Sequence, residues 1–319
     1  MHGIGVDVGG TSIKAVRLDS TGEVIATSRA ATPRADPTAE RTVAVVADLV
    51  AGLGSAGATG GAVADAVRAV GLVVPGIVDE SSGRSVFAGN LGWRDLPLRD
   101  LLAEACDLPV VFGHDVRAGG LAEARLGAAR GRRSALFVPV GTGIAAALVL
   151  DGRPLAGRGH AGELGHVVVD EDGEQCVCGR RGCVETLASA AALARRYSAR
   201  AGEPVTGAVE VVARMEAGDQ LAREVWHEGV AALARGLDAA TTLLDPEIIV
   251  LGGGLARAGS RLADDVRAGL ADRLTFQPVP EVTTAQLGDE AGGLGAALLA
   301  LDRWGPDVTG SAAYPVPVT

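Results

Sequence analysis

The sequence predicts an α/β protein of two domains built on a repeated plan. The chain has 319 residues, more than one ordinary domain usually holds. Apolar runs of strand length alternate with longer segments of helical periodicity. A strand, a glycine turn and a second strand also occur twice, at residues 4–18 and 135–150. We therefore expect the two copies to face one cleft.

The first copy breaks at Gly9-Gly10-Thr11 and continues as an alternating strand. No helical period follows these glycines, so the segment is not the strand–loop–helix unit of a Rossmann or P-loop protein. The other elements expected in this half are helices at about 38–53, 98–105 and 116–126 and strands at 69–73 and 109–112.

The second copy breaks at Gly141-Thr142-Gly143, between strands expected at 135–140 and 144–150. The region 157–184 is rich in Gly, Cys and Arg and is expected to be irregular. The elements expected after it are helices at about 185–201, 219–244, 259–272 and 290–303 and strands at 247–251 and 281–287.

Composition argues against several classes of partner. The formal net charge is −10 and no Lys/Arg cluster is long enough to follow a phosphate backbone, which argues against nucleic acid. The start lacks the pattern of a signal peptide, and no window of about 18 residues is purely apolar. We therefore expect a cytoplasmic protein with no membrane partner, in which cysteines serve as ligands or free thiols.

Three glycine turns are candidates for binding a nucleotide, because glycine lets backbone N–H groups approach phosphate oxygens closely. Asp7 precedes the first turn, and a carboxylate there suits a hydrated magnesium ion; a solvated Asp on a plain hairpin is the alternative. Gly141-Thr142-Gly143 would hold the other side of a polyphosphate. Gly252-Gly253-Gly254 would let a flat adenosine lie against backbone, although an ordinary loop is nearly as good an interpretation.

A cysteine-rich segment carries the most specific motif, with the spacing H-x9-C-x-C-x4-C. This spacing fits a closed tetrahedral zinc site. The expected ligands are His166, Cys176, Cys178 and Cys183. Glu163 and Glu185 flank them, and a zinc knot would fix both carboxylates as acceptors for a polyhydroxylated ligand. The alternative for each glutamate is a solvated surface position.

Asp115 follows His114 at the end of an expected strand and directly before an expected helix. A carboxylate there can take a proton from an attacking hydroxyl, as a general base does. An Asp before a helix is also a common N-cap. The pattern of residues alone leaves these two interpretations equal.

Together these segments resemble the ROK family of repressors, open reading frames and sugar kinases. The resemblance spans nearly the whole chain, and the cysteine motif is its most specific part. It is carried by DVGGTSIKA at 7–15, PG at 75–76, NLGW at 90–93, Asp115, GTGI at 141–144, ELGH at 163–166, CVCGRRGC at 176–183 with Glu185, and LGGG at 251–254.

The resemblance implies the actin-like, ribonuclease-H-like ATPase fold, with a cleft between two α/β domains. We expect a small domain at 1–115 completed by a helix at about 290–304, a large domain at 116–289, and a flexible tail at 305–319. The implied activity is ATP-dependent phosphorylation of the 6-hydroxyl of a hexose, with glucose as the first choice. Family kinases are commonly homodimers or homotetramers.

The resemblance also implies roles for particular residues. Asp115 would be the general base, and His166 would bind both zinc and sugar. The implied sugar contacts are Gly76, Asn90, His114, Asp115, Glu163, His166 and Glu185. The implied contacts to ATP and magnesium are Asp7, Gly9, Gly10, Thr11, Gly141, Thr142, Gly143, Gly252, Gly253 and Gly254.

Two positions depart from the family pattern, since His114 replaces an Asn and Ala145 replaces a Gly. The first leaves an N-acetylglucosamine or N-acetylmannosamine kinase as an alternative, and polyphosphate remains open as the donor. A sugar sensor without catalysis is an alternative from another class, against which Asp7, Asp115 and the zinc set argue. A ROK repressor needs a helix-turn-helix ahead of the phosphate motif, which begins here at Asp7.

Overall fold

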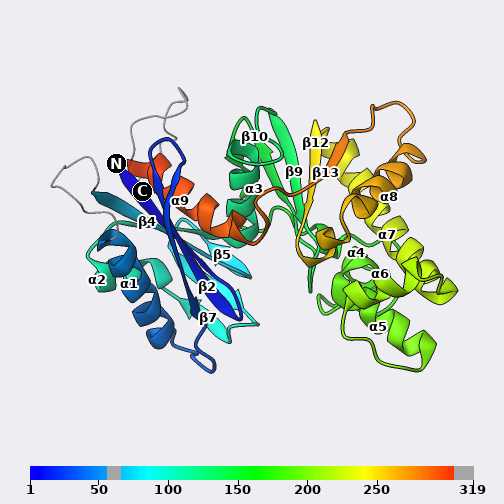
Figure 1. The fold of residues 1–319 in the computed structure, drawn as a ribbon, viewed down its shortest axis with the longest axis horizontal. Helices are drawn as coiled ribbons and strands as arrows, with labels where there is room; N and C mark the ends of the chain where they lie inside the picture. Colours follow the sequence, from blue (N-terminus) through cyan, green and yellow to red (C-terminus); the bar gives the residue numbers. More distant parts are fainter. Residues whose placement is uncertain (56–65, 305–319) are drawn as a thin grey trace. The chain divides into compact units, whose positions relative to one another are not determined.

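The computed structural model describes residues 1–55 and 66–304, so the tail expected from Gly305 lies outside the described residues. The chain divides into two compact α/β units (Figure 1). Unit 1 comprises Met1–Ala122, Ala156–His160 and Glu290–Thr319, and unit 2 comprises Glu123–Leu155 and Ala161–Asp289. Each unit has its own hydrophobic core.

Unit 1 is built on a five-stranded sheet with the order β3-β2-β1-β4-β8. Its strands are β1 (His2–Val8), β2 (Ser12–Asp19), β3 (Val24–Ala31), β4 (Val67–Val74) and β8 (Val110–His114). The first three form an antiparallel meander, whereas β4 runs parallel to both β1 and β8. The carboxyl ends of β1, β4 and β8 therefore lie at one edge. A small antiparallel sheet contains β5 (Ile77–Asp79), β6 (Arg84–Ala88) and β7 (Trp93–Leu96).

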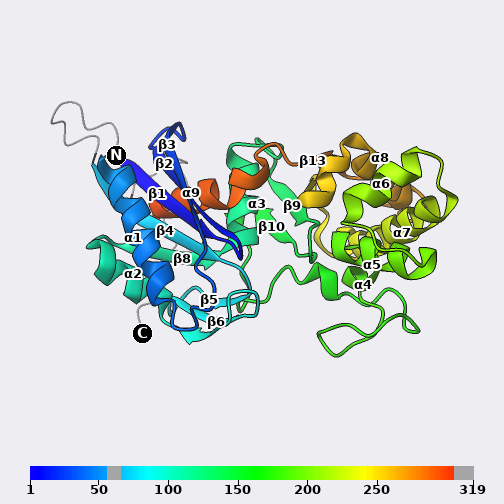
Figure 2. The ribbon, with the colours of Figure 1, turned by 60° about the horizontal axis from the view of Figure 1, so that its bottom comes forward.

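Helices cover both faces of this sheet (Figures 1 and 2). They are α1 (Glu40–Ser55), α2 (Leu98–Cys106), α3 (Asp115–Arg125) and α9 (Ala291–Trp304). Apolar side chains of α1 and α2 pack on one face, in the core that includes Val6 and Leu72. On the other face α9 lies so close that a Cβ at Gly71 would be 1.9 Å from the Ala296 carbonyl oxygen. Glycine is required there because any side chain would meet backbone.

Unit 2 repeats the plan of unit 1 with the strand order β11-β10-β9-β12-β13. Its strands are β9 (Ser134–Pro139), β10 (Ala147–Leu150), β11 (Arg153–Pro154), β12 (Ile248–Gly252) and β13 (Glu281–Thr284). Again three strands are antiparallel, and the next two run parallel to the first of them. The repeated strand–glycine turn–strand pattern thus predicted a repeated topology correctly.

Most of the helical residues of unit 2 lie to one side of its sheet (Figure 2). The helices are η2 (Leu164–His166), α4 (Val184–Ala188), α5 (Ala190–Ala201), α6 (Ala208–Glu216), α7 (Gln220–Leu244), η3 (Gly254–Ala258) and α8 (Ser260–Ala271), and η4 (Gly288–Glu290) follows at the boundary of the unit. The single helix expected at 185–201 is divided at Ser189, whose extended backbone ends α4. The Ser189 hydroxyl then caps α5 by accepting from the Ala192 N–H. Across the described residues, no helix combines the length and apolar character that a membrane span requires.

Candidate functional site

Three of the predicted site segments of unit 1 lie at one edge of its sheet. Asp7 stands near the end of β1, Gly76 follows β4, and Asp115 follows β8. Because β4 pairs in parallel with both other strands, the three carboxyl ends are neighbours. In α/β sheets, ligands bind outside the carboxyl ends of the strands. The pairing therefore brings together residues that lie more than a hundred positions apart in the sequence.

The first glycine turn is anchored by the chain that follows β3. The Thr32 N–H donates to the Thr11 carbonyl oxygen at 3.1 Å, and the Thr32 hydroxyl donates to the Gly9 carbonyl oxygen at 2.6 Å. Gly10 and Thr11 remain exposed. The Asn90 amide lies against the turn, since a Cβ at Gly10 would be 3.3 Å from Asn90 Nδ2. Asn90, which was expected at the sugar, therefore lies beside the first glycine turn of unit 1.

Asp7 lies where the start of α9 reaches the sheet. A Cβ at Gly292 would be 2.5 Å from Asp7 Oδ2, so only glycine permits this approach. The positive end of a helix dipole favours a nearby carboxylate or phosphate. Gly76 has a separate steric reason to be glycine. Its φ of +93° is left-handed, and a Cβ would lie 2.2 Å from the Phe87 carbonyl oxygen.

Asp115 presents a carboxylate that is 29% exposed at the start of α3. Its Oδ1 accepts from the Val116 N–H at 2.7 Å, one residue on, whereas an N-cap accepts from residues two or three positions on. The same N–H is shared with His114 Nδ1 at 3.2 Å. His114 Nδ1 also lies 3.4 Å from Asp115 Oδ1.

A buried arginine two residues after Asp115 was missed from the sequence. Arg117 Nε donates to Glu80 Oε1 at 2.8 Å, and Arg117 NH1 donates to the Gly159 carbonyl oxygen at 3.3 Å. The arginine is almost fully buried while Glu80 is partly exposed. This pair ties α3 to the hairpin of β5 and β6, and to the inserted segment 156–160. The sequence gives no clear signal for this pair, because α3 carries other charged residues, among them Glu123 and Arg125, from which Arg117 does not stand out.

Two glycine turns are adjacent in unit 2, because β9 and β12 run parallel and both turns follow their carboxyl ends. The Val140 N–H donates to the Gly252 carbonyl oxygen at 2.9 Å, and the Leu255 N–H donates to the Val140 carbonyl oxygen at 3.0 Å. Gly253 has a φ of +77°, and a Cβ there would be 2.6 Å from the Val140 carbonyl oxygen. Thr142, Gly143 and Gly254 are exposed beside this junction.

A pocket of about 210 Å³ opens beside the second of these turns. Its wall is formed by α6, which the sequence did not predict, and by the start of η3. The residues that line it are Val209, Val212, Ala213, Glu216, Gly254, Leu255, Arg257 and Ala258. A pocket with apolar walls and polar groups at its rim suits a flat heterocycle, which is the ligand that the glycine run predicted.

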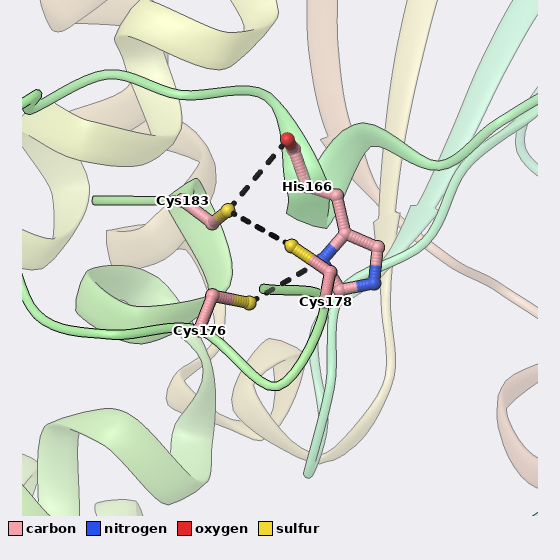
Figure 3. A group of neighbouring side chains, drawn as sticks. All are labelled: His166, Cys176, Cys178 and Cys183. Atoms are coloured by element: carbon pink, nitrogen blue, oxygen red, sulfur yellow. Dashed lines mark hydrogen bonds between the residues drawn. The ribbon is translucent and has the colours of Figure 1, made fainter. Parts of the chain in front are cut away.

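The four expected metal ligands converge on one point (Figure 3). They are His166 Nδ1 and the Sγ atoms of Cys176, Cys178 and Cys183, which all lie within 4.8 Å of one another. The Cys178–Cys183 sulfur distance and the Cys176 Sγ–His166 Nδ1 distance are both 3.6 Å. A tetrahedral zinc with bonds of about 2.3 Å to sulfur would place its ligand atoms about 3.7 Å apart. The donor set and its spacing therefore fit zinc.

Without a bound metal, the thiols of Cys178 and Cys183 have pKa values shifted in opposite directions. The backbone N–H of Arg180 lowers the pKa of Cys178 to about 6, whereas burial raises the pKa of the Cys183 thiol to about 12. A bound divalent cation favours the thiolate form of both. The second ring nitrogen, His166 Nε2, lies on the opposite side from the cysteines, 4.0 Å from Glu163 Oε2. The geometry therefore allows one histidine to bind a metal through Nδ1 while Nε2 faces Glu163.

Glu185 has a contact that the sequence did not predict. It lies in the first turn of α4, a helix that begins directly after Cys183, one of the expected metal ligands. Its Oε2 accepts from the Ile144 N–H at 2.8 Å, at the end of the Gly141–Gly143 turn. The two residues are 41 positions apart.

Comparison with known proteins identifies the family. A sequence model of the ROK family matches residues 3–303. The glucokinase of Streptomyces coelicolor is 33% identical over 318 residues, covering 93% of this chain and 96% of its own. An N-acetylmannosamine kinase of Yersinia pseudotuberculosis is 32% identical over 303 residues, covering 93% and 98%.

Two solved structures are similar in fold and sequence. The ROK hexokinase of Thermus thermophilus has a TM-score of 0.85 and 34% identity, covering 94% of this chain and 98% of that chain. A ROK family glucokinase from Streptomyces griseus, in complex with glucose and AMPPNP, has a TM-score of 0.78 and 33% identity, covering 94% and 99%. Both confirm the actin-like sugar kinase fold that the resemblance implied.

Proposed function

Because the chain belongs to the ROK family, we propose that it is an ATP-dependent kinase that converts glucose to glucose 6-phosphate. The observation that carries this proposal is the position of Asp115. Its partly exposed carboxylate lies at the edge of the sheet where the carboxyl ends of the parallel strands meet, and the first glycine turn lies at the same edge. Full-length similarity to a Streptomyces glucokinase supports it, as does similarity to a glucokinase solved with glucose and AMPPNP.

Asp115 accepts the proton of the sugar 6-hydroxyl as that oxygen attacks the γ-phosphorus of ATP. A bond forms between the sugar oxygen and the γ-phosphorus, and the bond from the γ-phosphorus to the bridging oxygen of ADP breaks. The electron pair of that bond leaves with ADP. Such a transition state needs little covalent help, so the remaining residues act by position and charge.

The glycine turns bind the nucleotide. Gly9, Gly10 and Thr11 form one turn whose backbone N–H groups suit phosphate oxygens, and Gly141, Thr142 and Gly143 form another. The pocket beside Gly252, Gly253 and Gly254 takes the adenosine. Asp7 would hold a hydrated magnesium ion, which would supply positive charge beside the phosphates.

The sugar hydroxyls are bound by short polar groups and carboxylates. The proposed contacts are Gly76, Asn90, His114, Asp115, Glu163, His166 and Glu185. Glu163 and His166 stand together at η2, which makes them a pair of acceptor and donor for neighbouring hydroxyls.

We propose that His166, Cys176, Cys178 and Cys183 hold one zinc ion per chain with a structural role. All four positions of a tetrahedron are filled by protein, so none is left for water or substrate. The residues between Cys176 and Cys183 form turns with little apolar burial, and a metal would replace the missing core.

The test is a coupled assay with ATP or polyphosphate and a panel of hexoses, on the wild type and Asp115→Asn. The variant should still bind glucose and AMPPNP, but kcat should fall by about 10²–10⁴-fold, the usual contribution of a general base. Near-full kcat in Asp115→Asn would remove the proposed role. Absence of phosphorylation of any hexose by the wild type would favour a sugar sensor without catalysis.

A second candidate is phosphorylation of an N-acetylhexosamine. The similarity to an N-acetylmannosamine kinase and the replacement of Asn by His at position 114 favour it. The same panel decides, because kcat/KM for N-acetylglucosamine or N-acetylmannosamine would then exceed kcat/KM for glucose.

We also propose a cytoplasmic homodimer or homotetramer that acts in carbohydrate metabolism at the entry to glycolysis. None of the four cysteines, all of which lie in the described residues, forms a disulfide, which agrees with a reducing compartment. The oligomeric state rests on the family resemblance, and light scattering at several protein concentrations measures it directly.

A further inference from the structure

Glu185 connects two parts of unit 2 that the proposed mechanism uses separately. It belongs to α4, which begins directly after a proposed zinc ligand, and it is a proposed sugar contact. Its carboxylate Oε2 also accepts from the Ile144 N–H at 2.8 Å. A Cβ at Gly143 would be 2.6 Å from the same oxygen, so the carboxylate lies directly against the turn.

The same helical segment holds both ends of this glycine turn. The Ala190 N–H, at the start of α5, donates to the Gly141 carbonyl oxygen at 2.8 Å. Glu185 holds the other end through Ile144. Between them, Thr142 and Gly143 are exposed and available to phosphate oxygens. The shape of the turn therefore depends on where α4 and α5 place these two groups.

One carboxylate can serve the turn and a sugar at once. Oε2 is occupied by the Ile144 N–H, while Oε1 accepts no hydrogen bond from the part of the chain that the structure describes. A glutamate side chain loses rotamer freedom when it is fixed. A sugar hydroxyl that donates to Oε1 would fix the rotamer that also holds Ile144. Nucleotide would then bind to a turn that is already ordered.

We propose that Glu185 is a positioning residue for the nucleotide turn, through which sugar binding and nucleotide binding strengthen each other. The proposal rests on the proposed kinase function, and it extends the role of Glu185 beyond that of a sugar contact. Coupling of this kind is reciprocal, so each ligand raises the affinity for the other by the same factor.

Calorimetry with AMPPNP, without sugar, tests the positioning role. We expect Glu185→Ala to bind AMPPNP about 10-fold more weakly, because the Ile144 N–H loses its hydrogen bond to a charged carboxylate. Glu185→Gln retains an oxygen for the Ile144 N–H, so its AMPPNP affinity should stay close to that of the wild type. Glu163→Gln is the matched control, because it removes a proposed sugar carboxylate that has no bond to the turn.

Glucose titrations with and without AMPPNP then measure the coupling, which should be several-fold in the wild type and absent in Glu185→Ala. Unchanged AMPPNP affinity in Glu185→Ala would overturn the proposal. If that variant does not fold, Gly143→Ala decides, since its Cβ would displace the carboxylate, and unchanged affinity would again overturn it. The AMPPNP titration contains no sugar, so its result does not depend on which sugar the protein binds. Failure of the proposed kinase function would be seen in a different experiment, the coupled assay, in which the wild type would phosphorylate no hexose.

Discussion

His114 occupies the position directly before the proposed base, at the end of β8, and its side chain is 13% exposed. An Asn there offers an acceptor and a donor on one amide, whereas a neutral imidazole offers them on opposite sides of a ring. His114 Nδ1 already accepts from the Val116 N–H at 3.2 Å. One ring nitrogen is therefore used by the backbone, and bidentate contact with a sugar is lost.

We expect His114→Asn to raise kcat/KM for glucose and to change the ranking of glucose, mannose and N-acetylated hexoses. One added hydrogen bond is worth about 0.5–1.5 kcal/mol, or about 2- to 12-fold. His227→Asn is the matched control, because His227 is exposed on α7 in unit 2. A ranking that is the same in both variants and the wild type would show that His114 does not contribute to specificity.

Single residues were predicted well where the signal is local in the sequence. The four residues His166, Cys176, Cys178 and Cys183 were expected together and lie together, because three cysteines and a histidine within a short, glycine-rich segment favour a common site; their binding of zinc stays a prediction. The contact between Glu185 and Ile144 was not found, since it spans 41 positions and forms only when α4 packs beside the turn. Arg117 and Glu80, 37 positions apart, were missed for the same reason.

At the scale of elements, the packing of α9 depends on glycines in the strands beneath it. A Cβ at Gly71 of β4 would be 1.9 Å from the Ala296 carbonyl oxygen, and one at Gly5 of β1 would be 2.0 Å from the Gly293 carbonyl oxygen. These atoms belong to the helix backbone, so a side chain could be accommodated only by moving the whole helix. The start of α9 also lies against Asp7, the proposed magnesium residue.

We expect Gly71→Ala to lower the free energy of unfolding by at least about 3 kcal/mol. This is the upper end of the usual cost of overpacking, and it applies here because the new Cβ would meet backbone atoms. Gly52→Ala in α1 is the control, because a Cβ there meets nothing within 4 Å. That substitution should raise stability by up to about 1 kcal/mol through helix propensity. Urea unfolding measures both, and a Gly71→Ala protein as stable as the wild type would contradict this account of α9.

Strongly periodic segments were predicted closely, whereas short or half-polar ones were not. The helix expected at 219–244 is observed at Gln220–Leu244, because its apolar face repeats over seven turns. The short helix α6 and the strands β5 to β7 were missed, since a few residues carry no clear period. The helix expected at 185–201 is broken at Ser189, where the serine caps a new helix.

At the scale of the whole molecule, the repeated strand order follows from a pattern visible in the sequence. Both sheets have an antiparallel meander followed by two parallel strands. The pairing of β1 with β4, and of β9 with β12, joins strands that are far apart in the sequence. Periodicity identifies a buried strand but does not say which other strand lies beside it, so this pairing could not be deduced from the pattern. The family resemblance supplied that part of the fold.

The two units have separate cores, and all of the proposed zinc ligands belong to unit 2. Zinc removal should therefore act on one unit first. We expect a chelator to release about one zinc per chain and to abolish hydrogen-exchange protection around residues 163–190. Protection of the Ile144 amide should fall with it, because α4 begins directly after the proposed ligand Cys183 and carries Glu185, which accepts from that N–H. Amides of β1 and β4 in unit 1 should keep their protection.

Cysteine substitutions provide the matched control for this prediction. Cys178→Ser removes an exposed proposed ligand and should lower the zinc content and the AMPPNP affinity together. Cys106→Ser, in α2 of unit 1, should change neither, because Cys106 lies outside the group of His166 and three cysteines. Protein purified without chelator that contains far less than one zinc per chain would contradict the site. Equal loss of protection in both units would contradict the independence of their cores, since it would show that the metal stabilises the chain as one cooperative body.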